Sequence, residues 1–211
     1  VPGTYDDAVR AAAEAALAGA ALLVADTGAD PHDPVVVDVM AGYGVIADEI
    51  RAQLADARHP APTHLFVQAG VGGLAAAMAD RLHAALAPPA RIVVAEPEAA
   101  ACVAAALAAR RPVPVGGPLE TAADMLSCGE ASAPALAILR RHGADALAVS
   151  EAGLLAAPGF LQAHGGPATT PSGAAGLAGL RAALADPALA RRAVLDPESR
   201  VLLLITEALP S

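Results

Sequence analysis

The chain of 211 residues contains no lysine, since all 13 of its basic residues are arginines. A reaction in which a lysine amine forms a Schiff base with a carbonyl group therefore cannot use a residue of this chain. Tryptophan is also absent and aromatic residues make up only 2% of the sequence. Alanine, leucine and valine must therefore build the core, because apolar residues still account for 55% of the chain.

Other absences exclude whole classes of function. The net charge of −9 and the lack of any basic run argue against nucleic-acid binding. No apolar run approaches the ~20 residues that span a bilayer, and no secretory signal is visible, so we expect a cytoplasmic location without membrane contact. Cys102 and Cys128 are too few for a disulfide framework, and their spacing matches no zinc site. They are interpreted as two buried thiols, with pairing left open.

Short apolar segments alternate with segments of helical character along most of the chain. This pattern predicts an α/β fold of three layers, with a mostly parallel sheet covered by helices on both faces. The expected strands are 21–25, 64–69, 91–95, 146–149 and 200–205. The expected helices are 4–19, 34–57, 74–86, 98–110, 120–126, 133–141, one near 151 and one from 172 or 173 to 185, with a loop over 160–171. Ligands of such sheets bind beyond the carboxyl ends of the strands.

The strongest local motif lies between a predicted strand and a predicted helix, in the stretch from Gln68 to Leu74. Gly70, Gly72 and Gly73 allow a sharp turn and a close approach of the backbone to an anion. The helix that follows offers free amide groups and a favourable dipole, which suits a phosphate monoester. The motif is neither a dinucleotide fingerprint nor a Walker A loop. The alternative is a glycine turn that only lets helix and strand pack together.

Three further positions could carry chemistry, each with a plain structural alternative. Asp26 follows a predicted strand and could act as an acid or base, or it could cap the next loop. Ser172, which precedes Gly173, could bind a ligand, although capping of a helix is favoured. Thr206 could offer its hydroxyl to a ring nitrogen, or be an ordinary strand-end threonine. The six histidines show no ligand-type pairing and are interpreted as surface or loop residues.

Several segments together resemble one family. They include Met40-Ala41-Gly42-Tyr43-Gly44, the glycine motif above, Val94-Ala95-Glu96-Pro97-Glu98, Leu126-Ser127-Cys128-Gly129-Glu130, Ser172-Gly173-Ala174 and Thr206-Glu207. The series resembles the C-terminal half of diaminopropionate ammonia-lyase, a fold-type II pyridoxal-phosphate (PLP) enzyme of the tryptophan-synthase-β type. One departure is Pro171, where the family usually has glutamate.

The resemblance implies a reaction and a cofactor. The reaction is α,β-elimination of ammonia from 2,3-diaminopropionate, a small amino acid, to give pyruvate and ammonia, with PLP as the electron sink. It implies that Thr206 faces the pyridine nitrogen, that Asp26 transfers a proton in the reaction of the D-isomer, and that Cys102 and Cys128 can lie close together. It implies that the phosphate is held by Gly70, Val71, Gly72, Gly73 and Leu74, and that Thr27, Tyr43, Ser172 and Gly173 lie in substrate or cofactor loops.

The resemblance also predicts how the chain is organised. Residues 1–20 would end the small lobe or form a connecting helix, and residues 21–211 would form the phosphate-binding portion of the large domain. The Schiff-base lysine would lie in an N-terminal half outside this sequence, so the chain alone should be inactive. Members of the family commonly form homodimers, so the resemblance also implies a homodimer. Two alternatives remain open: another fold-type II lyase of the threonine or serine dehydratase type, and a non-catalytic phosphate-binding α/β module.

Overall fold

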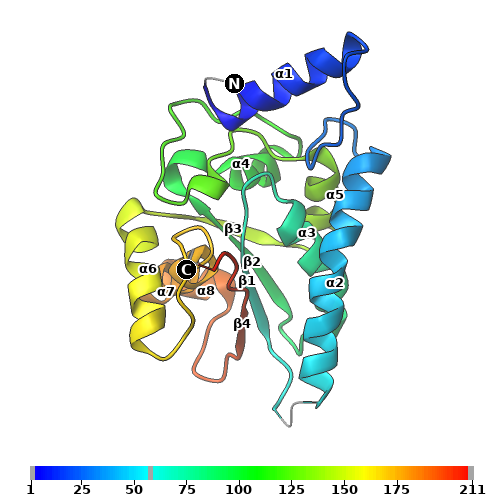
Figure 1. The fold of residues 1–211 in the computed structure, drawn as a ribbon. Helices are drawn as coiled ribbons and strands as arrows, with labels where there is room; N and C mark the ends of the chain where they lie inside the picture. The colour runs from blue at the N-terminus through cyan, green and yellow to red at the C-terminus, as the bar shows by residue number, and fades with distance from the viewer. Residues whose placement is uncertain (1–2, 57–58, 209–211) are drawn as a thin grey trace.

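A parallel sheet of four strands forms the centre of the protein in the computed structural model, which describes residues 3–56 and 59–208 (Figure 1). The strands are β1 (His64–Gln68), β2 (Arg91–Pro97), β3 (Asp145–Val149) and β4 (Val201–Leu203). Their order is β3-β2-β1-β4, with every neighbouring pair parallel. All carboxyl ends therefore meet at one edge of the sheet, where ligands of such folds bind.

Helices cover both faces of the sheet, which confirms the predicted three-layer α/β fold (Figure 1). One face carries α2 (Pro34–Asp56), α3 (Gly73–Leu82), α4 (Cys102–Ala109) and α5 (Ala133–Arg141). The other carries α6 (Glu151–Ala163), α7 (Ala175–Ala185) and α8 (Pro187–Ala193). Short 3-10 turns span His83–Ala85, Glu98–Ala100 and Asp124–Leu126. Helix α1 (Tyr5–Leu17) lies beyond the carboxyl ends of the strands, at the top of Figure 1.

Successive side chains of the buried strands point to opposite faces of the sheet, so the core has two halves, one on each face. In β1, Leu65 and Val67 pack with α2 to α5, whereas Phe66 packs with the helices of the opposite layer. Alanine and glycine let the helices approach the sheet closely: a Cβ at Gly179 of α7 would lie 2.7 Å from the Cβ of Ala95. The small residues that dominate the composition therefore permit close packing in a core with few aromatic rings.

The apolar run 21–25 was predicted as a strand, and this prediction was wrong. The segment pairs with none of the four strands, and Leu22 and Val24 are 90% and 69% exposed. It follows α1, which is distant from the edges of the sheet (Figure 1), so its backbone reaches no partner strand. A short apolar run does not identify a strand without such a partner.

Several boundaries also differ from the prediction. Helix α6 continues to Ala163 through Pro158, so part of the predicted loop 160–171 is helical, and α8 was not predicted. The predicted helix 98–110 begins as an α-helix only at Cys102, and the predicted helix 120–126 is reduced to one 3-10 turn. The last predicted strand shrinks to Val201–Leu203. Residue 57, the expected end of the second helix, lies outside the described residues, as do residues 1–2 of the segment 1–20 and residues 209–211 of the portion 21–211.

His64 corrects the interpretation of the histidines as surface or loop residues. It lies in β1 with no exposed surface, and its ring nitrogens contact the Thr63 hydroxyl at 2.7 Å and the Ala193 carbonyl at 3.0 Å. Burial lowers the pKa of His64, so the ring is neutral near neutral pH. It acts as a hydrogen-bonded core residue that joins the sheet to α8.

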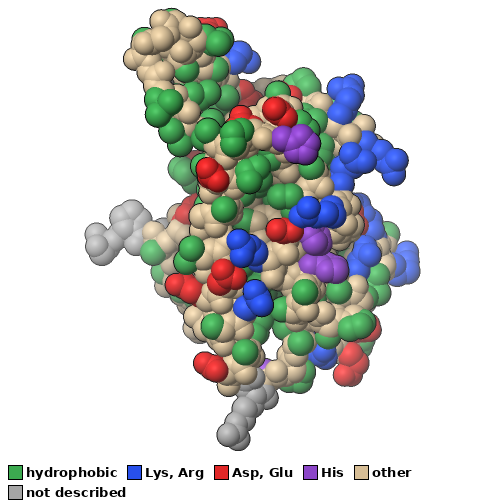
Figure 2. Space-filling model, turned by 90° about the vertical axis from the view of Figure 1, so that its right-hand side faces the viewer, with side chains coloured by type: hydrophobic (Ala, Val, Ile, Leu, Met, Phe, Trp, Pro, Cys, Tyr) green, Lys and Arg blue, Asp and Glu red, His purple; other side chains and the backbone are tan. Residues whose placement is uncertain are grey.

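The surface on the side of α2 mixes charges of both signs (Figure 2). Arg81 pairs there with Asp48, and Arg141 pairs with Asp80. Such exposed pairs contribute about 0–1 kcal/mol each, so the core and not these pairs must hold the layers together. Among residues 3–56 and 59–208, no helix has both the length and the apolar character needed to cross a membrane.

Candidate functional site

A cavity of about 210 Å³ lies at the carboxyl ends of β1 and β4 and is also lined by Tyr5 in the first turn of α1. The glycine turn after β1 forms one wall, and α2 contributes Tyr43. Thr206 and Glu207, which follow β4, line the cavity together with Asp26 and Tyr5. Residues far apart in the sequence thus converge on one space, as the parallel arrangement of the strands requires.

The glycine turn gives this cavity a cradle for an anion. Gly72 adopts a left-handed conformation with φ of +99° and directly precedes α3, so the chain reverses sharply where the helix begins. Within the described part of the chain, the N–H groups of Gly72 and Gly73 find no backbone acceptor. A Cβ at Gly73 would project to 3.7 Å from the Tyr43 ring and 3.8 Å from the Asp26 carbonyl, into space that the glycine leaves free. Free amides, a helix N-terminus and open space fit a phosphate group.

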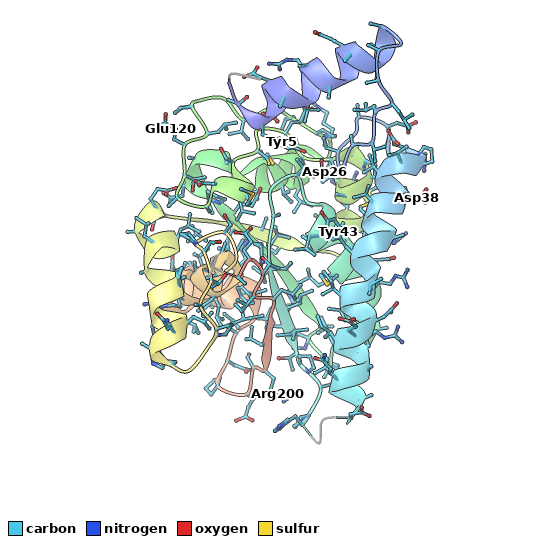
Figure 3. The ribbon with its side chains drawn as sticks, viewed as in Figure 1. Tyr5, Asp26, Asp38, Tyr43, Glu120 and Arg200 are labelled. Atoms are coloured by element: carbon cyan, nitrogen blue, oxygen red, sulfur yellow. The ribbon has the colours of Figure 1, made fainter. Side chains whose placement is uncertain are left out.

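Asp26 is held by a residue to which the sequence interpretation gave no role. The hydroxyl of Tyr5, in the first turn of α1, donates to Asp26 Oδ1 at 2.5 Å, and Figure 3 shows the two residues beneath α1. Burial raises the pKa of Tyr5, and the hydrogen bond to Asp26 raises it further. Tyr5 therefore remains a proton donor, which leaves Oδ2 of Asp26 available to a ligand. The only sequence signal was a tyrosine beside the Thr4 cap.

Thr206 is fixed at its backbone and at its side chain. Its carbonyl accepts a hydrogen bond from Thr169 Oγ1 at 2.5 Å, and its N–H donates to the Gly173 carbonyl at 3.4 Å. Its hydroxyl accepts a hydrogen bond from Gln68 Nε2 at 2.9 Å. Gln68 is only 3% exposed and, although it lies in the quoted glycine motif, sequence analysis assigned it no role.

The remaining predicted residues divide between the cavity and its surroundings. Ser172 is buried and accepts from the Met125 N–H at 3.2 Å. The favoured capping role for Ser172 was wrong, because α7 begins at Ala175 and its N-cap is Ala174. The Gly173 carbonyl accepts the hydrogen bond from the Thr206 N–H. Thr27 lines a neighbouring hollow instead of this cavity.

Cys102 and Cys128 are both buried and both free, which confirms the interpretation as two buried thiols. They lie on either side of Gly70: Cys102 donates to the Gly70 carbonyl at 3.3 Å, and a Cβ at Gly70 would approach the Cys128 sulfur to 2.9 Å. Burial raises the pKa of Cys102, and it raises the pKa of Cys128 to about 12. Both therefore stay protonated near neutral pH and act as weak nucleophiles.

Glu96, near the end of β2, stabilises the first turn of α4. The side chain is fully buried, and its two oxygens accept from the N–H groups of Val103 at 2.7 Å and Ala104 at 2.8 Å. It thereby satisfies free amides in the first turn of α4. Burial raises the pKa of Glu96 to about 8, while the two N–H donors act in the opposite direction.

This raised pKa predicts a pH dependence of stability. In the range between the usual glutamate pKa and about 8, the folded state retains a proton that the unfolded state has lost, so this contribution to stability is lost as pH rises through that range. Glu96→Gln cannot titrate, so its deficit in free energy of unfolding relative to wild type should shrink by on the order of 3 kcal/mol between about pH 5 and about pH 8. Urea titrations at several pH values measure this.

The exposed Glu98 provides the control, since Glu98→Gln should differ from wild type by a constant amount across the same pH range. A deficit of Glu96→Gln that stays constant with pH would show that the two N–H donors keep Glu96 ionised throughout.

The fold and the cavity together define a class: an α/β protein with a glycine-lined cavity at the carboxyl edge of a parallel sheet. Residues 1–207 match the family model described as pyridoxal-phosphate dependent enzyme. The chain belongs to this family, and the cofactor expected for it is PLP. Among the described residues, no group of His, Cys, Asp and Glu side chains could hold a metal ion.

Individual relatives confirm the resemblance to diaminopropionate ammonia-lyase. The enzyme of that name from Salmonella typhimurium is 33% identical over 220 residues, covering 96% of this chain and 53% of that protein. A probable D-serine dehydratase from Burkholderia pseudomallei is 35% identical over 170 residues, covering 69% of this chain and 38% of that protein. Diaminopropionate ammonia lyase from Escherichia coli, in complex with an aminoacrylate-PLP azomethine reaction intermediate, superimposes with a TM-score of 0.82. That structure is 27% identical, and the match covers 97% of this chain and 54% of that one. The chain thus spans about half the length of these ammonia-lyases.

Proposed function

We propose that this chain is part of a PLP-dependent ammonia-lyase that eliminates ammonia from 2,3-diaminopropionate to give pyruvate. Gly70, Val71, Gly72, Gly73 and Leu74 would hold the cofactor phosphate. Thr206 would donate a hydrogen bond to the pyridine nitrogen, and Asp26 would move a proton at the substrate. When bound, PLP supplies an electron sink for the charge that develops at the reacting carbon.

The observation that carries the choice of substrate is the charge of the cavity. Asp26 and Glu207 both line it, and its described lining contains no arginine or histidine. Glu207 is held in place by the hydroxyl of Thr170, which donates to its carboxylate. Two carboxylates without a nearby cation favour a substrate that carries a second ammonium group, as 2,3-diaminopropionate does and serine does not.

The absence of lysine, together with the length of the relatives, supports an arrangement in two parts. We propose that the Schiff-base lysine is supplied by the half of the enzyme that this chain does not span, and that these 211 residues alone are inactive. Residues 1–20 would connect the two lobes, and residues 21–211 would form the portion that holds the phosphate. Dimerisation stays a prediction from the family resemblance.

A second candidate function is the dehydration of a hydroxyamino acid. It is favoured by the relative described as a probable D-serine dehydratase, whose identity to this chain is 35%. The two candidates share the cofactor site and differ in the leaving group, which is ammonia in one case and water in the other.

The test is an assay of the polypeptide encoded by the complete open reading frame that contains these residues. Pyruvate or 2-oxobutyrate formation is followed with 2,3-diaminopropionate, serine and threonine, each as the D- and L-isomer. We expect kcat/KM for one isomer of 2,3-diaminopropionate to exceed every other value by about tenfold or more, as one charge-assisted contact predicts. Higher values for serine or threonine would establish the dehydratase, and a protein that binds phosphate without turnover would establish a non-catalytic module.

Glu207→Gln refines the same assay, because it keeps the shape of the side chain and removes its charge. The preference for 2,3-diaminopropionate over serine should fall by about tenfold, mainly through a higher KM. Glu120→Gln, at an exposed loop position distant from Asp26 in Figure 3, is the matched control and should leave the preference unchanged. An unchanged preference in Glu207→Gln would remove the electrostatic argument for the substrate.

A further inference from the structure

We propose that Gln68 is a positioning residue that fixes the direction of the Thr206 hydroxyl proton and thereby keeps the cofactor's ring nitrogen unprotonated. This inference rests on the proposed function, because it concerns the contact between this chain and the pyridine ring. Its new element is the role of Gln68, which touches Thr206 and is argued to act only through it.

The hydrogen-bonding groups around Thr206 determine where its hydroxyl proton points. The Gln68 amide nitrogen lies 2.9 Å from Thr206 Oγ1, and an amide NH₂ group can only donate. The Thr206 oxygen must therefore accept, so its own proton has to point elsewhere. Within residues 3–56 and 59–208, this proton finds no acceptor. Thr206 therefore presents an unsatisfied donor to the cavity that it lines.

The surroundings hold both residues in this arrangement. Gln68 ends the central strand β1, is 3% exposed, and has a Cα partner in the neighbouring strand, Ala95. Its carbonyl oxygen Oε1 points toward α7, where a Cβ at Gly176 would lie 3.4 Å away, and it has no hydrogen-bond partner among the described residues. Thr206 is held at its carbonyl by Thr169 and at its N–H by Gly173. The hydroxyl of Thr206 could still rotate, and the hydrogen bond from the Gln68 amide prevents this rotation.

The consequence for a pyridine ring follows from the polarity of this pair. A hydroxyl that donates to the ring nitrogen occupies its lone pair without transferring the proton, because an alcohol is a very weak acid. A hydroxyl turned toward its other neighbour would instead offer lone pairs to the ring, which favours the protonated nitrogen. The side chain at position 68 thus decides which form of the ring the protein stabilises.

Two substitutions separate this role from simple packing. Gln68→Glu retains the size of the side chain but replaces the NH₂ donor with a carboxyl oxygen that can accept the Thr206 proton, so it draws this proton away from the cavity. Thr206→Val removes the hydroxyl and retains the shape. If Gln68 acts through Thr206, Gln68→Glu should have no further effect on the ring nitrogen in the Thr206→Val background.

The measurement uses the polypeptide encoded by the complete open reading frame that contains these residues, in complex with pyridoxamine 5′-phosphate labelled with ¹⁵N in the ring, a ligand that binds without forming a bond to lysine. In the wild-type complex we expect the ¹⁵N chemical shift of an unprotonated, hydrogen-bonded nitrogen. In Gln68→Glu we expect a shift toward the protonated value and binding weakened by about tenfold. Gln162→Glu, at an exposed position in α6, is the matched control and should reproduce the wild-type spectrum. Circular dichroism verifies the folding of each variant.

The outcomes distinguish this inference from the function on which it rests. A protonated nitrogen in the wild-type complex, or identical spectra for wild type and Gln68→Glu, would overturn the role of Gln68 and leave the cofactor site standing. A change caused by Gln68→Glu that persists in the Thr206→Val background would also overturn it. Failure of the folded wild-type polypeptide to bind the ligand at millimolar concentration would contradict the proposed function itself.

Discussion

Asp26→Asn is expected to lower kcat of the complete enzyme by about 100- to 10,000-fold, the usual contribution of a group that transfers a proton. The amide retains the size of the side chain and can still accept from the Tyr5 hydroxyl, which donates to Oδ1 at 2.5 Å in the structure. It cannot take up a proton. The loss should therefore appear in the chemical step, as a reduced rate of pyruvate formation at saturating substrate.

A control variant and a binding measurement complete this prediction. Asp38 lies exposed on α2, and Figure 3 shows it apart from Tyr5 and Asp26, so Asp38→Asn should have wild-type activity. Asp26→Asn should still bind pyridoxamine 5′-phosphate, because the phosphate is assigned to the glycine turn. An Asp26→Asn enzyme with wild-type kcat for both isomers of the substrate would exclude Asp26 as the proton-transfer group.

Gly173→Ala is expected to disturb the site strongly, because the space beside Gly173 is filled by the Thr206 backbone. A methyl group at this position would overlap the Thr206 carbonyl oxygen and the Thr169 hydroxyl, and it would lie 2.8 Å from the Thr206 carbonyl carbon. Backbone atoms cannot rotate away as a flexible side chain could, so the strand end that carries Thr206 must move. We expect the free energy of unfolding to fall by about 3 kcal/mol and binding of pyridoxamine 5′-phosphate to be largely lost.

The same substitution at Gly159 is the matched control. Gly159 lies within α6, and a Cβ there meets no other atom within 4 Å. Gly159→Ala should be neutral or should stabilise the protein by up to about 1 kcal/mol, because alanine favours a helix. Urea unfolding and isothermal titration give the two quantities for both variants. Wild-type stability and affinity in Gly173→Ala would show that the Thr206 segment is free to shift and is not held by Gly173.

The sequence was sufficient to predict the four strands that form the sheet and the glycine turn after β1, because both depend on local patterns. The strands β1 and β2 are short, apolar and rich in branched side chains, and the glycines at 70, 72 and 73 mark the turn between β1 and α3. Parallel strands bring their carboxyl ends together, so Thr206, which follows the last predicted strand, was expected near that turn. Asp26 was expected there as the end of a strand over 21–25 that does not form. The structure places both residues in one cavity with the turn.

The contacts that tune the site could not be predicted from sequence, since they join segments that are distant along the chain. Tyr5 contacts Asp26 because α1 lies over the carboxyl end of the sheet. Gln68 donates to Thr206, which lies 138 residues further along the chain. Glu207 lacked a role because glutamate side chains are usually exposed. The run 21–25 was misassigned for the related reason that a strand requires a partner, which composition does not reveal.

The loose attachment of α1 has a consequence for access to the cavity. None of its residues is fully buried, and it is tied down by hydrogen bonds from its first turn, including that from the Gly129 N–H to Asp6 at 3.0 Å. Detaching this helix would break these polar contacts and the packing of Tyr5 against the core, while the layered core would remain, so it would require far less free energy than global unfolding. Because Tyr5 and Asp26 both line the cavity, a displacement of α1 would open that wall and free Asp26 from its tyrosine partner.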